Sequence, residues 1–292
     1  MFDAQWFIRR CALRRHAVIS CTLGIALGCG CMRTSRGAEK PLWEVGIGVG
    51  LLAFDDYRGS DSAHSYPIPI PYVVYRGKFF KADHEGVRGQ VFNNDRLDLT
   101  LSLNATTPVS SRDSDARVGM PDLKPTFELG PELDVHLWRS ADDRLRLTLQ
   151  LPARRSMTLA ANPRAVGWLF APSLDLDVEH VAGQAGWIAG IQAGPLFADR
   201  DYLRYFYAVA ANFATASRPA YEPAGGYSGA ELLLGTSRRF KRFWVFAFAR
   251  HDSLAGADFL ASPLVRSRNY WFGGVGFAWL IGKSSRQVEA RD

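Results

Sequence analysis

The residues best suited to chemistry in this chain are histidines that stand close to carboxylates. His136 follows Asp134 by two residues, so both side chains fall on one face of an extended strand. His251 directly precedes Asp252, and residues 142–143 are paired aspartates. A serine hydrolase needs Ser and His with a polar group that orients the imidazole, and an Asp/His protease needs pairs such as these. These residues therefore raise the hypothesis of a hydrolase.

None of these candidate sets is complete. No serine motif accompanies His136, and residues 142–143 lie in a stretch typical of a tight turn, where aspartate is common for conformational reasons. After residue 38 the chain has no His-x-x-x-His, no cysteine pair and no acidic calcium loop. The glycine pairs at 225–226 and 273–274 do not open a helix after a strand, as a phosphate loop would. We therefore predict no catalytic, cofactor-binding or metal-binding residues, and no cofactor.

The positive charge of the chain is concentrated at its N-terminus. Residues 1–38 contain six arginines and one acidic residue, Asp3, which accounts for +5 of the net charge of +6. The rest of the sequence is nearly neutral, whereas a nucleic-acid-binding surface needs a basic patch in the mature domain. All four cysteines also lie before residue 32. We therefore expect no nucleic-acid partner and no disulfide in the mature fold.

The N-terminus has the features of a signal peptide. Residues 9–16 are basic, and residues 17–31 form an apolar run that is short for a membrane span and typical of an export signal. Small residues after this run favour cleavage that starts the mature chain near Ala38 or Glu39. The alternative is a lipidated start at Cys29, which lies in a weak lipobox.

After residue 40 the sequence alternates between apolar and polar side chains. Leucine occupies the odd positions of 97–104 and of 145–151, and mainly polar residues occupy the even ones. This period of two predicts strands with two different faces. In a soluble sandwich the apolar face is the core, whereas in an outer-membrane barrel it meets lipid and the polar face lines the lumen. Export and the length of the alternating segments favour the barrel.

The predicted fold is all-β: a single antiparallel transmembrane β-barrel of about 12 strands, which follows the signal peptide. The expected organisation is a signal peptide over 1–38, the barrel over 39–282 and a polar C-terminal tail over 283–292. Short turns are predicted at 93–95, 141–143 and 238–242, and longer loops on the opposite rim at 108–123 and 214–226. The predicted strands are 42–54, 66–76, 79–92, 96–107, 124–139, 144–153, 167–180, 184–198, 202–213, 227–238, 242–254 and 268–282.

Charged residues occupy the polar face of three neighbouring predicted strands. Opposite charges on adjacent strands can pair, which predicts ion pairs inside the wall. The alternative is a lining that attracts cations into a channel. The residues are Glu128, Glu132 and Asp134; Arg144 and Arg146; and Asp175, Asp177 and Glu179.

Three prolines alternate in one predicted strand, at Pro67, Pro69 and Pro71. Proline has no N–H to give to a ladder, and the three missing groups all fall on one phase of the strand. This pattern predicts a segment at a rim or an edge of the sheet, with a surface for partner binding.

Several segments resemble the MltA-interacting protein / OmpV family of outer-membrane proteins. The resemblance implies an outer-membrane barrel without enzymatic activity, and one family member is regarded as a scaffold that joins a murein lytic transglycosylase to a murein synthase. Two features depart from the family: the polar tail after the last strand, and the absence of a family glycine near residue 208. The matching segments are Trp43–Gly50, Tyr57–Ser60, Tyr66–Pro69 with Tyr72, Tyr205–Val209, and Ser262–Val265 before Trp271.

The function predicted from the sequence is that of a structural or scaffolding protein of the outer membrane. It would serve peptidoglycan assembly or envelope organisation, with outer-membrane lipid around it. Its partners, as the resemblance implies, would be a murein lytic transglycosylase and a murein synthase. A narrow channel for small solutes is the first alternative, and an outer-membrane hydrolase is the second.

Overall fold

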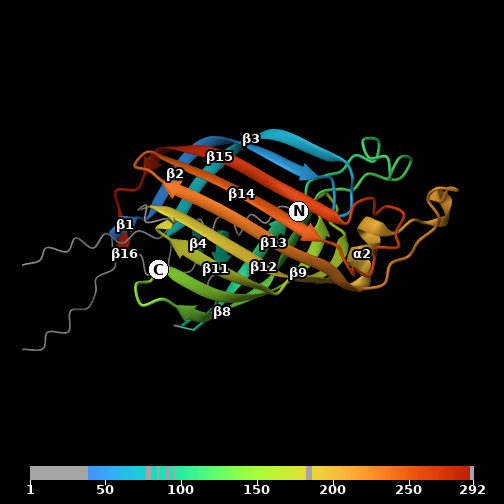
Figure 1. Ribbon diagram of the computed structural model, residues 1–292. Helices are drawn as coiled ribbons and strands as arrows, with labels where there is room; N and C mark the ends of the chain where they lie inside the picture. Colours follow the sequence, from blue (N-terminus) through green and yellow to red (C-terminus); the bar gives the residue numbers. More distant parts are fainter. Residues whose placement is uncertain are drawn as a thin grey trace, which may run out of the picture.

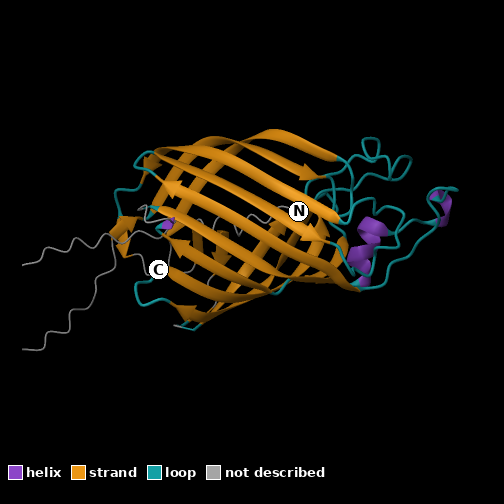
Figure 2. Cartoon of the chain, in the orientation of Figure 1, coloured by secondary structure: helices purple, strands orange, loops and turns teal. Residues whose placement is uncertain are grey.

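The computed structural model describes residues 39–76, 80–83, 86–89, 92–94, 96–181 and 186–289. The signal peptide predicted over 1–38, with its cleavage site and Cys29, lies outside these residues. The described chain forms a β-barrel with most of its helical structure at one end (Figures 1 and 2). No helix among these residues is long and apolar enough to cross a membrane.

Fourteen strands of the described chain form one antiparallel sheet. β2 pairs with β15, the last long strand, along most of its length, so the first and last long strands lie side by side. A separate short ladder joins β1 (Glu39–Pro41) to β16 (Gln287–Glu289). The strands are β2 (Trp43–Asp55), β3 (Ala63–Arg76), β4 (Phe80–Asp83), β5 (Gly86–Gly89), β6 (Phe92–Asn93), β7 (Leu97–Ala105), β8 (Thr126–Arg139), β9 (Leu145–Thr158), β10 (Ala165–Phe170), β11 (Ser173–Glu179), β12 (Trp187–Ala198), β13 (Gly226–Arg239), β14 (Phe243–Ser253) and β15 (Asn269–Lys283).

The apolar phase of the strands faces outward, as the alternation predicts. On β7, Leu101 and Leu103 are 41% and 40% exposed, whereas Ser102 and Asn104 are 0% and 1% exposed. On β2, Val49 is 68% exposed. A wall with its leucines and valines outside and its hydroxyls and amides inside is inverted relative to a soluble protein, and it suits a barrel surrounded by lipid.

The two ends of the barrel differ in their connections. At one end, which we call the turn end, strands are joined by short turns such as 140–144 and 240–242, and the β1–β16 ladder lies there too. At the other, the loop end, the connections are long and include 106–125, 199–225 and 254–268. The prediction that short turns and long loops occupy opposite rims is confirmed.

One predicted strand, 202–213, is wrong. These residues form helix α2 (Arg200–Tyr207) and a turn of 3-10 helix, η2 (Ala211–Phe213), at the loop end. Asp199 caps α2, because its carboxylate accepts a hydrogen bond from the backbone N–H of Tyr202 at 2.8 Å. The buried side chains of α2 lie on one helical face. Aromatic residues favour strands, so the sequence of this segment resembles that of a strand.

Two other predicted strands are interrupted. The segment 79–92 is not one strand: it contains β4, β5 and the start of β6, and β4 and β5 form a hairpin of four residues on each side. The segment 167–180 is split at Ala171 and Pro172 into β10 and β11, which pair with the same two neighbours. The C-terminal tail predicted over 283–292 carries β16.

The proline-rich strand β3 has its partners mainly on one side among the described residues. β3 pairs with β2 along its whole length, from Ala63 to Tyr75. On its other side the described residues pair only at Tyr75 and Arg76, with β4. Pro67, Pro69 and Pro71 therefore stand where a ladder partner is lacking among the described strands.

Candidate functional site: the capped loop end and the polar lumen

The long loops at the loop end pack together into a cap over the barrel. Helix α2 supplies Tyr202, Leu203 and Tyr207, all at most 5% exposed, to an apolar cluster with residues of the other loops. The Tyr207 ring stacks on Phe259 with centroids 3.8 Å apart. A second small cluster joins Leu264 to Val209 and Ala116. Loops that are far apart in sequence thus share one core outside the barrel wall.

Two buried arginines tie the backbones of these loops together. Arg218 donates to the carbonyl oxygens of Ala116 at 3.1 Å and Val118 at 2.9 Å. Arg117 donates to the carbonyl oxygens of Phe206 at 3.1 Å and Pro121 at 3.2 Å. Burial lowers the pKa of Arg117. Carbonyl groups that would otherwise be buried without a partner are satisfied by these guanidinium groups, which fixes the cap.

Tyrosine hydroxyls make further bonds across the cap. Tyr57 donates to the carbonyl oxygen of Leu264 at 2.7 Å, and Tyr207 donates to that of Arg58 at 2.7 Å. Burial raises the pKa of Tyr57 to about 12, and it also raises the pKa of Tyr207. Both phenols therefore stay protonated at neutral pH and serve as donors.

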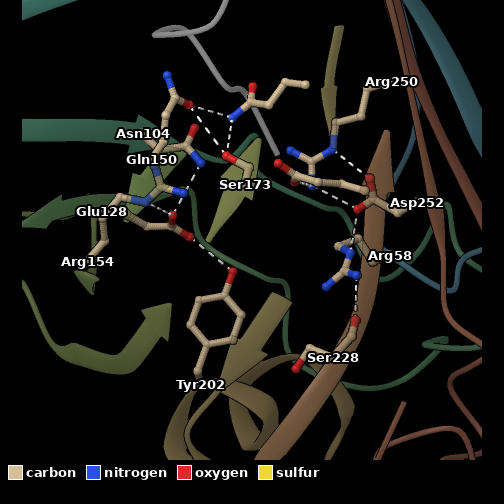
Figure 3. A network of polar contacts seen from close by, with 12 residues as sticks. Arg58, Asn104, Glu128, Gln150, Arg154, Ser173, Tyr202, Ser228, Arg250 and Asp252 are labelled. Carbon is tan, nitrogen blue, oxygen red and sulfur yellow. Dashed lines mark hydrogen bonds and ion pairs between the residues drawn. The ribbon is translucent and has the colours of Figure 1, made fainter. Parts of the chain in front are cut away.

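Directly below the cap, Glu128 on β8 is the centre of a polar network (Figure 3). Its carboxylate accepts from the Tyr202 hydroxyl at 3.0 Å and from the Asn104 amide at 3.2 Å. Arg154 on β9 lies 3.5 Å from the same carboxylate and donates to Ser102 at 3.1 Å. Glu128 is 0% exposed, so these partners replace its hydration.

A second charged cluster lies on β13 and β14 (Figure 3). Arg250 donates two hydrogen bonds to Asp252, at 2.7 and 2.8 Å, and lies 2.8 Å from Glu231. Arg58, from the loop after β2, lies 2.6 Å from Asp252 and donates to the carbonyl oxygen of Ser228. Two guanidinium groups thus face two carboxylates, and the cluster carries no net charge.

A third group is uncharged. The Gln192 side-chain amide donates to the amide oxygen of Gln150 and to the hydroxyl of Ser173, each at 2.9 Å. Gln150 is 3% exposed and Gln192 6%. The three residues lie on β9, β11 and β12, in the same polar half of the lumen as Glu128.

The prediction of ion pairs inside the wall is confirmed at Glu128 but not at Arg144. Glu128 pairs with Arg154, which the sequence does not indicate because the strand predicted over 144–153 ends before Arg154, whereas β9 continues to Thr158. Arg144 lies in a turn and pairs with Asp142 at 3.3 Å, outside the lumen. Because β9 begins at Leu145, Arg144 precedes the strand and does not lie on its inner face.

The histidines proposed for hydrolysis do not form the expected pairs. His136 lies 3.1 Å from Asp98, on the neighbouring strand, rather than bonding to Asp134. His251 and Asp252 are adjacent on one strand, so their side chains take opposite faces, with Asp252 inside.

The outward His251 has a polar partner, and it bonds to no nucleophile in the part of the chain that the structure describes. Its imidazole lies 3.1 Å from the Asn269 side-chain oxygen and packs on Trp271. Ser253, two residues on, uses its hydroxyl to accept from the backbone N–H of Ala255.

The paired aspartates at 142–143 serve the turn. Asp142 accepts from Ser140 at 2.7 Å, and this bond, with one from the backbone N–H of Arg144, lowers the pKa of Asp142. Asp143 adopts a positive φ of 58°, a conformation that aspartate tolerates in turns. Among the described residues, no group of three or more His, Cys, Asp or Glu side chains is placed to hold a metal ion.

The barrel-shaped antiparallel sheet, its apolar outer wall and its polar lumen define an outer-membrane β-barrel protein. The chain belongs to the family described as MltA-interacting protein MipA, whose family model matches residues 47–281. The protein is located in the outer membrane, as are its relatives.

The relatives include two outer-membrane proteins of Vibrio species. The chain is 27% identical over 211 residues to outer membrane protein OmpV of Vibrio cholerae, and 26% identical over 211 residues to outer membrane protein Omp26La of Vibrio anguillarum. Each match covers 70% of this chain and 75% of the relative.

Solved structures similar to this chain include other outer-membrane proteins. A bacterial polysaccharide outer membrane secretin matches with a TM-score of 0.41 and 9% identity, over 82% of this chain and 99% of that one. Outer membrane phospholipase A from Escherichia coli matches with a TM-score of 0.31 and 10% identity, over 81% of this chain and 92% of that one.

Proposed function

We propose that this protein is a non-enzymatic scaffold of the outer membrane that serves peptidoglycan assembly through partners in the periplasm. The observation that carries the proposal is the internal compensation of the buried charges. Each acidic group of the two charged networks lies against an arginine, and the cap above them is fixed by buried donors. A rigid, capped barrel suits a protein that presents a surface. The family description adds that a member interacts with MltA.

We infer that the turn end faces the periplasm. Outer-membrane barrels place short turns on the periplasmic side and long loops outside the cell. The first and last long strands, β2 and β15, begin and end at this rim, at Trp43 and Lys283, as an even number of crossings requires.

The turn end carries an exposed basic pair that we propose as a contact for an acidic partner. Lys241 and Arg242 are exposed in the turn between β13 and β14. Their neighbours have structural roles: Arg239 lies 2.7 Å from Glu44, and Arg238 packs over the ring of Phe240. Only the exposed pair is therefore suited to contact a partner without disturbing the fold.

The test is crosslinking in intact cells, followed by purification of the protein and identification of what accompanies it. The scaffold proposal expects a murein lytic transglycosylase or a murein synthase. Lys241→Glu with Arg242→Glu should reduce the recovery of this enzyme. The reduction should be larger at low salt, because exposed charges then act over a longer range.

The matched control makes the same charge change at the loop end, with Arg112→Glu and Lys124→Glu, and should leave recovery unchanged. Equal recovery from all three proteins would remove the basic pair from the proposal, and the absence of any murein enzyme would overturn the scaffold role.

The alternative of a narrow solute channel is decided by conductance in planar bilayers. The cap packs over one mouth of the barrel, and the arginines of the lumen are paired with carboxylates. Both features oppose a standing ion current, and the scaffold proposal expects none.

A further inference from the structure

The outward face of β9 carries one charged side chain, Arg155. It is exposed, whereas its neighbour Arg154 points inward to Glu128. A charged group on this face meets either acyl chains or lipid head groups, and its cost is lowest where the hydrocarbon ends. The depth of Arg155 in the membrane therefore decides what it can bind. Toward the loop end, the outward side chains of β9 and β10 are Ala153, Arg155 and Met157, and Ala165, Trp168 and Phe170.

A row of aromatic side chains indicates that depth. Phe170, Phe197 and Tyr227 stand in register on β10, β12 and β13, and their ring centroids are 6.4 and 5.8 Å apart. Outer-membrane barrels place such girdles at the membrane interfaces. Phe170 pairs with Ala153, so Arg155 lies two residues nearer the loop end, about 7 Å along the strand. Its guanidinium group is therefore at the level of the head groups rather than among the acyl chains.

Trp168 holds this guanidinium group in place. Trp168 is the register partner of Arg155, and the guanidinium carbon lies 5.3 Å from the centroid of its ring, a cation–π contact. A register shift between Ala165 and Gly167 turns Trp168 outward, where it is 46% exposed. Gly167 has a φ of 150°, and a Cβ there would stand 2.3 Å from the backbone nitrogen of Tyr202. The bulge and helix α2 thus fix the ring that presents Arg155.

Two further cations, Arg164 and Lys124, are exposed at the same stretch of the rim. The N–H of Thr158 donates to the carbonyl oxygen of Arg164 at 2.9 Å, which places Arg164 beside the end of β9. The N–H of Leu159 donates to the carbonyl oxygen of Pro125 at 2.7 Å, which brings the segment of Lys124 to the same strand end. Three basic side chains therefore border the rim over β8, β9 and β10.

The positive charge of this rim is not balanced within the described chain. No carboxylate of the described residues forms an ion pair with any of the three cations. Three carboxylates nearby are engaged elsewhere: Asp122 accepts from the backbone N–H of Ser111 at 2.8 Å, Asp199 caps α2, and Glu222 lies against two arginines of α2. The rim is thus complementary to an anionic ligand.

From these features we propose that the rim over β8, β9 and β10 binds the phosphate groups of lipopolysaccharide, the phosphorylated glycolipid of the outer leaflet. A guanidinium group binds phosphate through two parallel hydrogen bonds, and Arg155 is presented at the level where the phosphates lie. Three cations suit a lipid with more than one phosphate, whereas a phospholipid with a single phosphate would leave part of the charge unbalanced. The acyl chains would lie on Leu103 and Leu129, which are exposed and pair across β7 and β8.

The proposal rests on the inferred orientation, with the loop end outside the cell, and not on the scaffold role. Loss of lipid binding would leave the capture of a partner at the turn end unaffected, so the two proposals fail separately. The orientation has its own measurement. Arg164→Cys should react in intact cells with a thiol reagent that does not cross the outer membrane. Reaction only after the membrane is broken would overturn the choice of lipopolysaccharide as the ligand.

The test of binding is native mass spectrometry of the folded protein in detergent micelles. The added lipids are diphosphoryl lipid A, which is the membrane anchor of lipopolysaccharide, dephosphorylated lipid A, and phosphatidylglycerol. Diphosphoryl lipid A should bind at least about tenfold more tightly than either of the others, because each lost phosphate removes charge-assisted hydrogen bonds. Equal binding of dephosphorylated lipid A would overturn the role of the phosphates, and equal binding of phosphatidylglycerol would overturn the preference for the glycolipid.

Substitutions assign the site. Arg155→Gln should weaken the binding of diphosphoryl lipid A about tenfold, and Trp168→Leu should weaken it as well, because the guanidinium group is then no longer held. The matched control is Arg238→Gln, since Arg238 lies over the ring of Trp187 at 5.7 Å but at the turn end; its binding should not change. Heat-modifiable migration on gels confirms that each variant is folded. Unchanged binding by Arg155→Gln, or equal losses from Arg155→Gln and Arg238→Gln, would overturn the proposal.

Discussion

The hydroxyl of Tyr202 on helix α2 donates a hydrogen bond to the carboxylate of Glu128 on β8, at 3.0 Å. This bond connects the cap to the wall of the lumen, and both residues are at most 5% exposed. Because Glu128 also accepts from Asn104 and lies beside Arg154, the position of α2 is coupled to the charged network below it. The cap is thus part of the folded barrel and not a set of independent loops.

Tyr202→Phe should destabilise the protein by about 1–3 kcal/mol, because a buried carboxylate loses a donor and nothing replaces it. The measurement is urea unfolding of the protein in vesicles. Tyr205→Phe is the matched control, since the Tyr205 hydroxyl donates to the carbonyl oxygen of Lys124 at an exposed site. If both variants lost the same free energy of unfolding, the bond between cap and wall would contribute no more than an exposed hydrogen bond.

Alkaline pH should loosen the cap. Burial raises the pKa of Tyr202 and Tyr207, and that of Tyr57 to about 12, from an ordinary value of 10.0. A raised folded-state pKa means that the folded chain keeps a proton that the unfolded chain releases. The stability from these phenols is therefore complete below about pH 10 and is lost as pH rises through the folded values. Stability measured from pH 8 to pH 12 should fall over this range, and Tyr57→Phe should flatten the fall. Constant stability up to pH 12 would contradict the burial of these groups.

Arg250→Leu should cost about 3–5 kcal/mol, because it leaves Asp252 and Glu231 as buried carboxylates with Arg58 as the remaining guanidinium of the cluster. Adding Asp252→Leu restores the balance of one cation and one anion and should recover part of the loss. The double-mutant cycle by urea unfolding measures the coupling. An additive result would mean that the two side chains do not act as a pair.

The two-sided character of the strands could be predicted from the sequence, because period-two alternation follows directly from strand geometry. The long loops and their rim could be predicted too. Helix α2 could not, since Tyr205, Phe206 and Tyr207 are strand-forming residues, and the cap at Asp199 and the packing of Tyr207 on Phe259 decide the outcome.

Of the candidate site, the sequence indicated Glu128 but not its partners. Arg154, Tyr202 and Asn104 come from three separate segments, and only the barrel register and the folding of the loops bring them together. Alternation tells which residues point inward, but not which of them meet. An edge at Pro67 to Pro71 stays a prediction, because the described residues pair with β3 on that side only at Tyr75 and Arg76.

The last prediction concerns that edge. Replacing Pro67, Pro69 and Pro71 by threonine restores three N–H groups that point away from β2. In a membrane each donor without a partner costs several kcal/mol, so the new edge should either pair with a second copy of the chain or destabilise the barrel. Native gels and crosslinking of the protein in vesicles detect the first result, and urea unfolding detects the second. The matched control introduces threonine at Ile47, Val49 and Leu51, which face the prolines in register on β2 and already donate within paired strands. This control adds the same side chains to the same face of the wall without creating a donor at an edge. A proline-free variant that stays monomeric and as stable as the control would show that the outer side of β3 is already covered.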